Sequence, residues 1–103
     1  GALGANTSAS NNTAIGANSL TLNTTGTSNV SVGRGSLGSN TTASNNTAAG
    51  DLSLNTNTTG AQNTALGSGA LFANTTAFLK LHNINEARII RFISHNKFSL
   101  SWP

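Results

Sequence analysis

The chain carries few side chains that could act as acids, bases or metal ligands. Asp51 and Glu86 are its only carboxylates, and they lie in segments of different composition, so no acid–base pair is predicted. His82 and His95 stand well apart in the sequence, with no third ligand in evidence. The absence of cysteine excludes a disulfide framework and a thiolate metal site. We therefore expect neither an enzyme nor a cofactor.

A phosphate-binding pattern, G-x-G-x-x-G, occurs once, where residues 33–38 read GRGSLG. A dinucleotide site also needs a preceding strand, a following helix and an acidic residue about 20 positions on. The Gly, Asn and Thr that surround this segment are poor helix formers. Gly33 and Leu37 also have counterparts at a constant spacing along the chain, so we interpret the match as part of a repeat.

The acceptor motif for N-linked glycans, N-x-[ST], occurs eight times. Its asparagines are Asn6, Asn11, Asn23, Asn29, Asn40, Asn45, Asn57 and Asn74. Two interpretations stay open. The motif is either the turn chemistry of a repeat, because Asn and Thr side chains bond to nearby backbone, or the acceptor set of a glycan-coated rod with its sequons at outward-facing turns.

The strongest pattern is a 17-residue register, held without insertion or deletion over residues 2–77. It contains a leucine column (Leu3, Leu20, Leu37, Leu54 and Leu71) and an asparagine column (Asn6, Asn23, Asn40, Asn57 and Asn74). It also contains a glycine column (Gly16, Gly33, Gly50 and Gly67) and an apolar column (Ile15, Val32, Ala49 and Leu66). A fixed short period of this kind predicts a solenoid.

Each repeat is predicted to contain short strands joined by tight turns. The motifs T-A-I-G and V-S-V-G alternate with the period of a half-buried strand. From this alternation we expect the first and third positions to point inward; the pairs are Thr13/Ile15, Val30/Val32, Thr47/Ala49 and Thr64/Leu66. The glycine that follows suits a corner with positive φ or close backbone approach. Stacked repeats would place Asn over Asn and Thr over Thr.

These patterns predict an all-β fold with two parts. Residues 1–77 form a parallel β-solenoid of about four and a half coils, and residues 78–103 form a β-rich hydrophobic C-terminal segment. The tail is expected to contact a subunit surface through Phe78, Leu79, Leu81, Phe98, Leu100 and Trp102. It either caps its own rod or pairs with the open end of the next subunit by β-augmentation.

Charge and hydropathy limit the classes of partner that we expect for this chain. The net charge is +3, but Lys80, Arg88, Arg91 and Lys97 all lie in the last quarter, with no RNA-binding motif among them. No apolar run approaches the ~20 residues that span a bilayer. Because each coil has so lean an interior and only neighbouring repeats stabilise one another, we expect self-association into an oligomer or filament. We predict that the chain does not bind nucleic acid and does not span a membrane.

The repeat pattern N-T-A-[IVL]-G-x-x-[AS]-L-x-x-N-T-T-G resembles the repeats of trimeric autotransporter adhesin heads and of some bacteriophage tail fibres. Residues 63–67 (NTALG) with Ala70, Leu71 and residues 74–76 (NTT) carry it most clearly. The resemblance implies a left-handed β-roll, usually trimeric, that projects from a cell or virion to bind a surface. The chain shows no heptad stalk, membrane-anchor strands or self-cleaving chaperone domain.

Three functions follow as expectations. The first is an extracellular structural protein, in which a self-associating solenoid forms a fibre or fibre segment. The second is a surface-binding head of adhesin or tail-fibre type that recognises glycans or matrix. The third is an ice-binding solenoid, based on two adjacent hydroxyl ladders. They are Thr7, Thr24, Thr41, Thr58, Thr75 and Ser8, Thr25, Thr42, Thr59, Thr76. Since adjacent residues point to opposite faces, only one ladder is expected to face outward.

Overall fold

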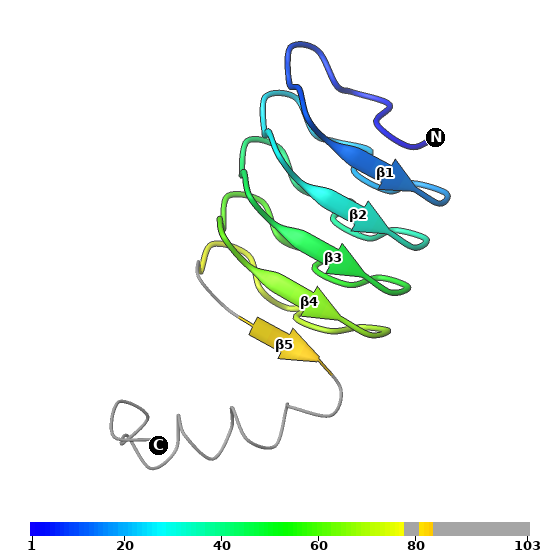
Figure 1. The fold of residues 1–103 in the computed structure, drawn as a ribbon, viewed down its shortest axis with the longest axis vertical. Coiled ribbons are helices and arrows are strands. Elements are labelled where there is room, and N and C mark those ends of the chain that lie inside the picture. The colour runs from blue at the N-terminus through cyan, green and yellow to red at the C-terminus, as the bar shows by residue number, and fades with distance from the viewer. Residues whose placement is uncertain (78–80, 84–103) are drawn as a thin grey trace.

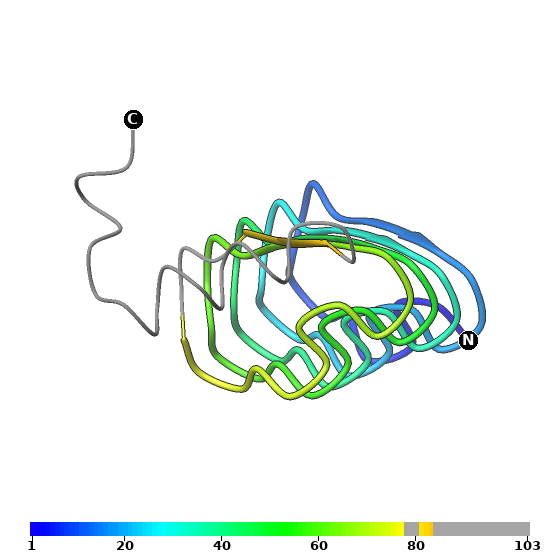
Figure 2. The same ribbon diagram turned by 90° about the horizontal axis from the view of Figure 1, so that it is seen from below.

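The computed structural model describes residues 1–77 and the backbone of residues 81–83, and in this part of the chain each repeat makes one turn about a common axis (Figures 1 and 2). The strands are β1 (Thr13–Ile15), β2 (Val30–Val32), β3 (Thr47–Ala49), β4 (Thr64–Leu66) and β5 (Leu81–Asn83). They form one parallel sheet in sequence order. Residues 1–77 and 81–83 contain no helix, and thus none that could cross a membrane. The predicted all-β, parallel character is confirmed.

The pairing register of the sheet equals the sequence period. Thr13 pairs with Val30, which pairs with Thr47, so each partner is the equivalent residue of the next repeat. The same step pairs Thr64 with Leu81, so the sheet extends beyond residue 77, the predicted end of the repeat segment. Backbone hydrogen bonds therefore run along the stack, from one repeat to the next, and each repeat is held chiefly by its neighbours.

A glycine ends each of the first four strands for a steric reason. The φ angles of Gly16, Gly33, Gly50 and Gly67 lie between 115° and 140°. A Cβ atom on Gly50 would lie 2.4 Å from the carbonyl oxygen of Gly67, closer than real Cβ contacts allow. Both predicted reasons for this glycine, positive φ and close backbone approach, are confirmed.

The apolar interior is a column of leucines facing a column of small residues. Leu20, Leu37 and Leu54 are fully buried, and Leu3 and Leu71 pack against them while partly buried. The leucines adopt a left-handed backbone, with φ of 49° at Leu37, which is uncommon for a side chain of this size. The facing positions are the central residues of the strands, namely Ala14, Ser31, Ala48 and Ala65.

The predicted direction of the strand side chains was wrong. In β1 to β4 the central residue points inward, so the pairs Thr13/Ile15, Val30/Val32, Thr47/Ala49 and Thr64/Leu66 lie on the outer face of the sheet. The reason is the narrow interior. Oγ of Ser31 lies 2.6 Å from Oγ of Ser19 and donates to the carbonyl oxygen of Ser36 at 2.7 Å, so the two walls touch. In β1 to β4 the central position accordingly holds Ala or Ser.

Buried amides join the repeats as regularly as the leucines do. Nδ2 of Asn40 donates to Oδ1 of Asn23 at 2.9 Å, and Nδ2 of Asn57 donates to Oδ1 of Asn40 at 3.0 Å. The same bond links Asn23 to Asn6 and Asn74 to Asn57. Within residues 1–77, each buried side-chain nitrogen or oxygen atom has a hydrogen-bond partner. The interior is therefore polar yet fully satisfied, as a stable buried network must be.

Neighbouring repeats are of two alternating types. One column reads Gly1, Asn18, Gly35, Leu52, Gly69, and another reads Ala9, Gly26, Ala43, Gly60, Ala77. A Cβ atom on Gly35 would lie 2.7 Å from Cδ2 of Leu52, so the glycine leaves room for the larger side chain of the next repeat. Nδ2 of Asn55 also donates to the carbonyl oxygen of Gly35 at 2.7 Å. The structural unit is therefore a pair of consecutive repeats.

Candidate association face

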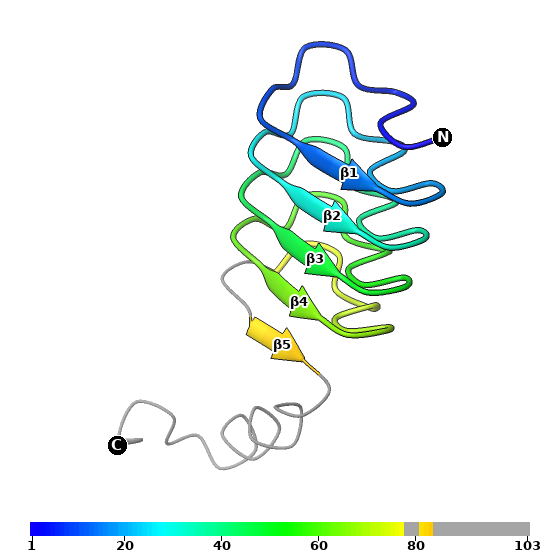
Figure 3. The same cartoon turned by 45° about the vertical axis from the view of Figure 1, so that its right-hand side comes forward.

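Strands β1–β4 follow one another down one side of the stack (Figure 3). Their outer face carries two parallel rows of side chains. The first row is Thr13, Val30, Thr47 and Thr64, and the second is Ile15, Val32, Ala49 and Leu66. Ile15 is 60% exposed, Leu66 42% and Val32 36%. Most of the large exposed hydrophobic residues in the described part of the chain thus lie on one flat face, which we name the strand face.

The strand face carries no charged side chain. Within residues 1–77 the charged side chains are Arg34 and Asp51, which follow the glycine corner, and Nη2 of Arg34 donates to Oδ2 of Asp51 at 2.8 Å. These two residues occupy the same column in adjacent repeats and neutralise each other. An apolar face of this regularity, bordered by polar turns, has the character of an interaction surface.

The two hydroxyl ladders have different surroundings. Hydroxyls of the first ladder donate along the stack: Oγ1 of Thr24 bonds to the carbonyl oxygen of Thr41 at 3.1 Å, and Thr7, Thr41 and Thr58 repeat this bond. The second ladder (Ser8, Thr25, Thr42, Thr59 and Thr76) is exposed. In residues 1–77 its hydroxyls make no hydrogen bond to protein. It forms a single row of hydroxyls open to solvent.

The expectation that the sequons lie at outward-facing turns was wrong for most of them. Five of the eight asparagines are buried, namely Asn23, Asn29, Asn40, Asn57 and Asn74, and Asn6 is half-buried. The two N–H groups of each buried amide are used inside the stack: in Asn40, for example, Nδ2 bonds to Asn23 and to the carbonyl oxygen of Ala43. Only Asn11 and Asn45 are exposed. The asparagine of the N-T-T motif thus belongs to the hydrogen-bonded interior of the stack.

Residues 33–38, the G-x-G-x-x-G match, have no free cradle of amides. The amide of Gly33 donates to the carbonyl oxygen of Ile15 at 2.7 Å, and that of Gly35 to Ala17 at 2.8 Å. The amide of Leu37 donates to Ser53 at 3.0 Å. Because phosphate binding by such a loop needs unsatisfied amides, this geometry agrees with the interpretation as a repeat element.

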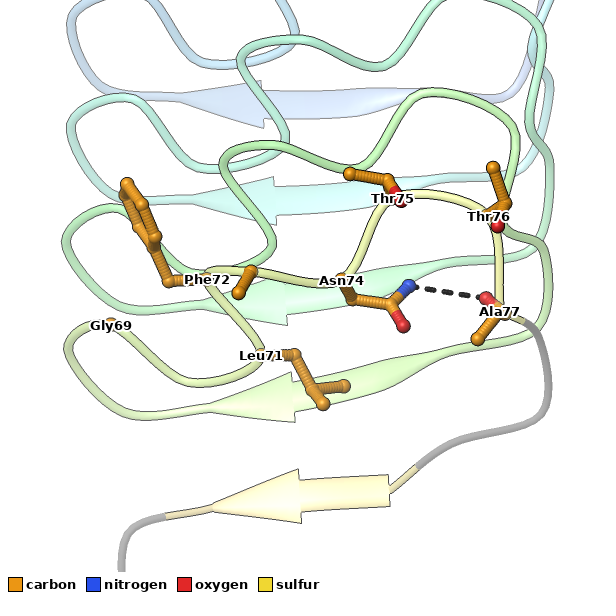
Figure 4. Close-up of a pocket in the computed structure, with 8 residues that line it drawn as sticks. Gly69, Leu71, Phe72, Asn74, Thr75, Thr76 and Ala77 are labelled. Atoms are coloured by element: carbon orange, nitrogen blue, oxygen red, sulfur yellow. Dashed lines mark hydrogen bonds between the residues drawn. The ribbon is translucent and has the colours of Figure 1, made fainter.

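A pocket lies at the end of the last described repeat, where Figure 4 shows Leu71, Phe72, Asn74, Thr75, Thr76 and Ala77 around it. Nδ2 of Asn74 donates across its wall to the carbonyl oxygen of Ala77 at 3.1 Å. Leu71 and Asn74 are the last described members of the buried leucine and asparagine columns. The pocket therefore lies at the end of the stacked interior.

Most of the predicted tail contacts lie outside the described residues. This applies to Phe78, Leu79, Phe98, Leu100 and Trp102, and also to Glu86 and His95. Leu81 lies in β5, where its backbone pairs with Thr64. His82 is the central residue of the same strand. In residues 1–77 and 81–83 no group of three or more His, Cys, Asp or Glu gathers in metal-binding geometry.

A second asparagine column begins the repeat motif, and its role in the stack is visible only in the structure. It consists of Asn12, Asn29, Asn46 and Asn63, which open successive repeats. Oδ1 of Asn29 accepts the backbone amide of Asn46 at 3.0 Å, and Nδ2 of Asn46 donates to the carbonyl oxygen of Gly60 at 2.9 Å. The signal was present, because each of these asparagines precedes its strand in the same register.

No protein-family model, curated protein or solved structure matches this chain.

Proposed function

We propose that this chain is an extracellular structural protein, a parallel β-solenoid of about four and a half coils. In this proposal, copies associate through their strand faces to form a fibre or a segment of one. The exposed row of Ile15, Val32 and Leu66 is the observation that carries the proposal. Burial of apolar surface stabilises association by roughly 25 cal/mol per Å², and this face offers it without a charge to desolvate.

A second copy of the same chain is the partner that suits the face. Both rows repeat with the pairing step of the sheet, so parallel copies meet equivalent side chains at each repeat. Two strand faces without charged side chains also bring no like charges together. The lean interior adds a reason for association, since each repeat buries one leucine against Ala or Ser. The resemblance to adhesin heads and tail fibres supports a place outside the cell or on a virion.

Two lysine substitutions test this proposal. We expect the purified chain to be oligomeric by analytical ultracentrifugation and elongated by negative-stain microscopy. Val32→Lys should weaken association by more than tenfold, because it places a charge at the centre of the face. Thr42→Lys, on the exposed hydroxyl row, is the matched control and should leave association unchanged. A monomeric wild-type chain, or equal association of both variants, would contradict the proposal.

The row of exposed hydroxyls supports a second candidate, a surface-binding head that contacts glycans or matrix. Thr25, Thr42, Thr59 and Thr76 are open to solvent and keep their hydroxyls free of protein partners among the described residues. Replacing all four by alanine should abolish binding to a glycan array and leave the sedimentation coefficient unchanged. Absence of glycan binding by the wild-type chain would reject this candidate and leave the structural proposal intact.

A further inference from the structure

The sequence presents eight N-x-[ST] motifs, and the structure separates them sharply by what their side chains do. Glycan transfer to asparagine requires that Nδ2 and the hydroxyl two residues later both reach an enzyme. In Asn23, Asn40, Asn57 and Asn74, Nδ2 donates once to an asparagine of the preceding repeat and once to the carbonyl oxygen three residues on. No N–H bond remains for reaction.

In two further sequons the asparagine side chain is also held by hydrogen bonds. Nδ2 of Asn29 donates to Asn12 and Ala43, and its hydroxyl partner, Ser31, is fully buried. Asn6 is half-buried, and its Nδ2 donates to the carbonyl oxygen of Ala9 at 3.0 Å. Removing either amide from these contacts would open the hydrogen-bonded wall of a repeat. In both sequons the side-chain amide is thus held by the stack in the folded chain.

Asn11 and Asn45 differ from the other six in the exposure and in the hydrogen bonding of the asparagine side chain. Both are exposed, and both sit in a turn with left-handed backbone, with φ of 62° and 63°. Neither side-chain amide has a hydrogen bond to any part of residues 1–77. Their hydroxyl partners, Thr13 and Thr47, lie on the outer face of the sheet. They share one column, two repeats apart, at the start of β1 and β3.

We infer that the folded chain accepts N-linked sugar at Asn11 and Asn45 and at none of its other sequons. The donor is an activated sugar with a phosphate leaving group. Nδ2 forms a bond to C1 of the sugar while the bond from C1 to the phosphate oxygen breaks. The phosphate departs with the electron pair, and the amide proton passes to a base of the transferase. This inference concerns the single folded chain, because Thr13 and Thr47 lie on the strand face that self-association would cover. It is tested at a concentration at which the chain is monomeric.

Trypsin makes the test simple, because cleavage after Arg34 and Lys80 divides the sequons evenly. Residues 1–34 contain Asn6, Asn11, Asn23 and Asn29, and residues 35–80 contain Asn40, Asn45, Asn57 and Asn74. A soluble N-glycosyltransferase is first checked to modify all eight sites of the urea-unfolded chain. The purified full chain is then treated with this enzyme and UDP-glucose. We expect one hexose on each tryptic peptide from the folded chain, at Asn11 and Asn45.

Three variants sharpen the result. Asn45→Gln should leave peptide 35–80 unmodified. Gln62→Asn should add a second hexose to it, because position 62 occupies the same exposed turn and Thr64 supplies the hydroxyl. Ser28→Asn should add nothing to peptide 1–34, since Val30 stands where the hydroxyl is needed. Circular dichroism of each variant checks that the fold is kept.

A second arm distinguishes the source of the sugar. Secretion from a host that transfers lipid-linked oligosaccharide should yield a protease-resistant chain with glycans at the same two asparagines. Modification in one arm alone identifies the donor that the chain accepts. Hexose on Asn23, Asn40 or Asn57 of the folded chain would overturn the inference. So would an unmodified Asn11 or an unmodified Asn45 in both arms.

Discussion

The side-chain amide of Asn40 donates a 2.9 Å hydrogen bond to Oδ1 of Asn23, its equivalent in the preceding repeat, and both side chains are fully buried. The bond holds two repeats in register and satisfies polar groups that burial would otherwise penalise. Asn57 donates to Asn40 in the same way. The column is therefore a continuous chain of amides, in which each member depends on the next.

Loss of one amide should be costly, because it leaves several buried groups without a partner. Asn40→Ala removes the donor to Asn23 and Ala43 and the acceptor for Asn57. We expect the free energy of unfolding to fall by about 3 kcal/mol, since each unsatisfied buried group costs roughly 1–3 kcal/mol. Urea denaturation measures it. Thr42→Ala, at an exposed position, is the control and should change stability by less than about 0.5 kcal/mol.

The leucine column should respond to truncation according to burial. Leu37 is fully buried, whereas Leu22 is 50% exposed. Leu37→Ala should lower the free energy of unfolding by roughly 2–5 kcal/mol, because it removes buried apolar contacts and leaves a cavity. Leu22→Ala should change it by less than about 1 kcal/mol. Equal effects in thermal or urea unfolding would show that the column is not the apolar core.

Two glycines with positive φ should differ in their tolerance of alanine. A Cβ atom on Gly50 would meet the carbonyl oxygen of Gly67 at 2.4 Å, while one on Gly69 would meet no atom within 4 Å among the residues described. Gly69→Ala should cost roughly 1–2 kcal/mol, from the left-handed backbone alone. Gly50→Ala adds a backbone collision and should cost more than about 3 kcal/mol. The difference between their urea midpoints is the measurement, and similar midpoints would argue against close stacking at this corner.

The pairing of unlike repeats predicts that insertions should respect a unit of two repeats. A second copy of residues 29–62, inserted after Gln62, keeps the alternation of Gly35 and Leu52 along the stack. A second copy of residues 29–45, inserted after Asn45, sets two Gly35-type repeats side by side and leaves a gap where a leucine would pack. Longer stacks gain stability from added interfaces. We expect the first insertion to raise the thermal midpoint and the second to raise it less per added repeat.

A greater stabilisation per repeat from the single-repeat insertion would contradict the two-repeat unit. Calorimetry provides the midpoints, and far-ultraviolet circular dichroism shows whether each insertion folds. A variant with Gly35→Ala supplies an independent check. Its added Cβ would lie 2.7 Å from Cδ2 of Leu52, so it should be more destabilising than the left-handed backbone of Gly35 alone explains, and Leu52→Ala should relieve that excess. Coupling between the two substitutions would locate the contact.

Much of the architecture is legible in the sequence because repetition encodes register. Leu20, Leu37 and Leu54 follow one another at a constant spacing, and the strands of the sheet pair with the same step. When equivalent residues recur in this way, each turn of the chain can satisfy its backbone only against the next. The parallel all-β character follows from that condition, as does the glycine at each corner.

Which face of each strand is buried was decided only by the tertiary structure. Alternation in Val30–Val32 identifies two faces but not which one is buried, and the more apolar face was the wrong choice. The leucine of the opposite wall already fills the interior, so Ser31 fits inside while Val30 and Val32 remain outside. The sequons show the same limit of local sequence. Asn40 and Asn45 carry the same motif, yet Asn40 lies in a buried amide column and Asn45 in an open turn. Accessibility depends on what packs across the coil, which local sequence does not record.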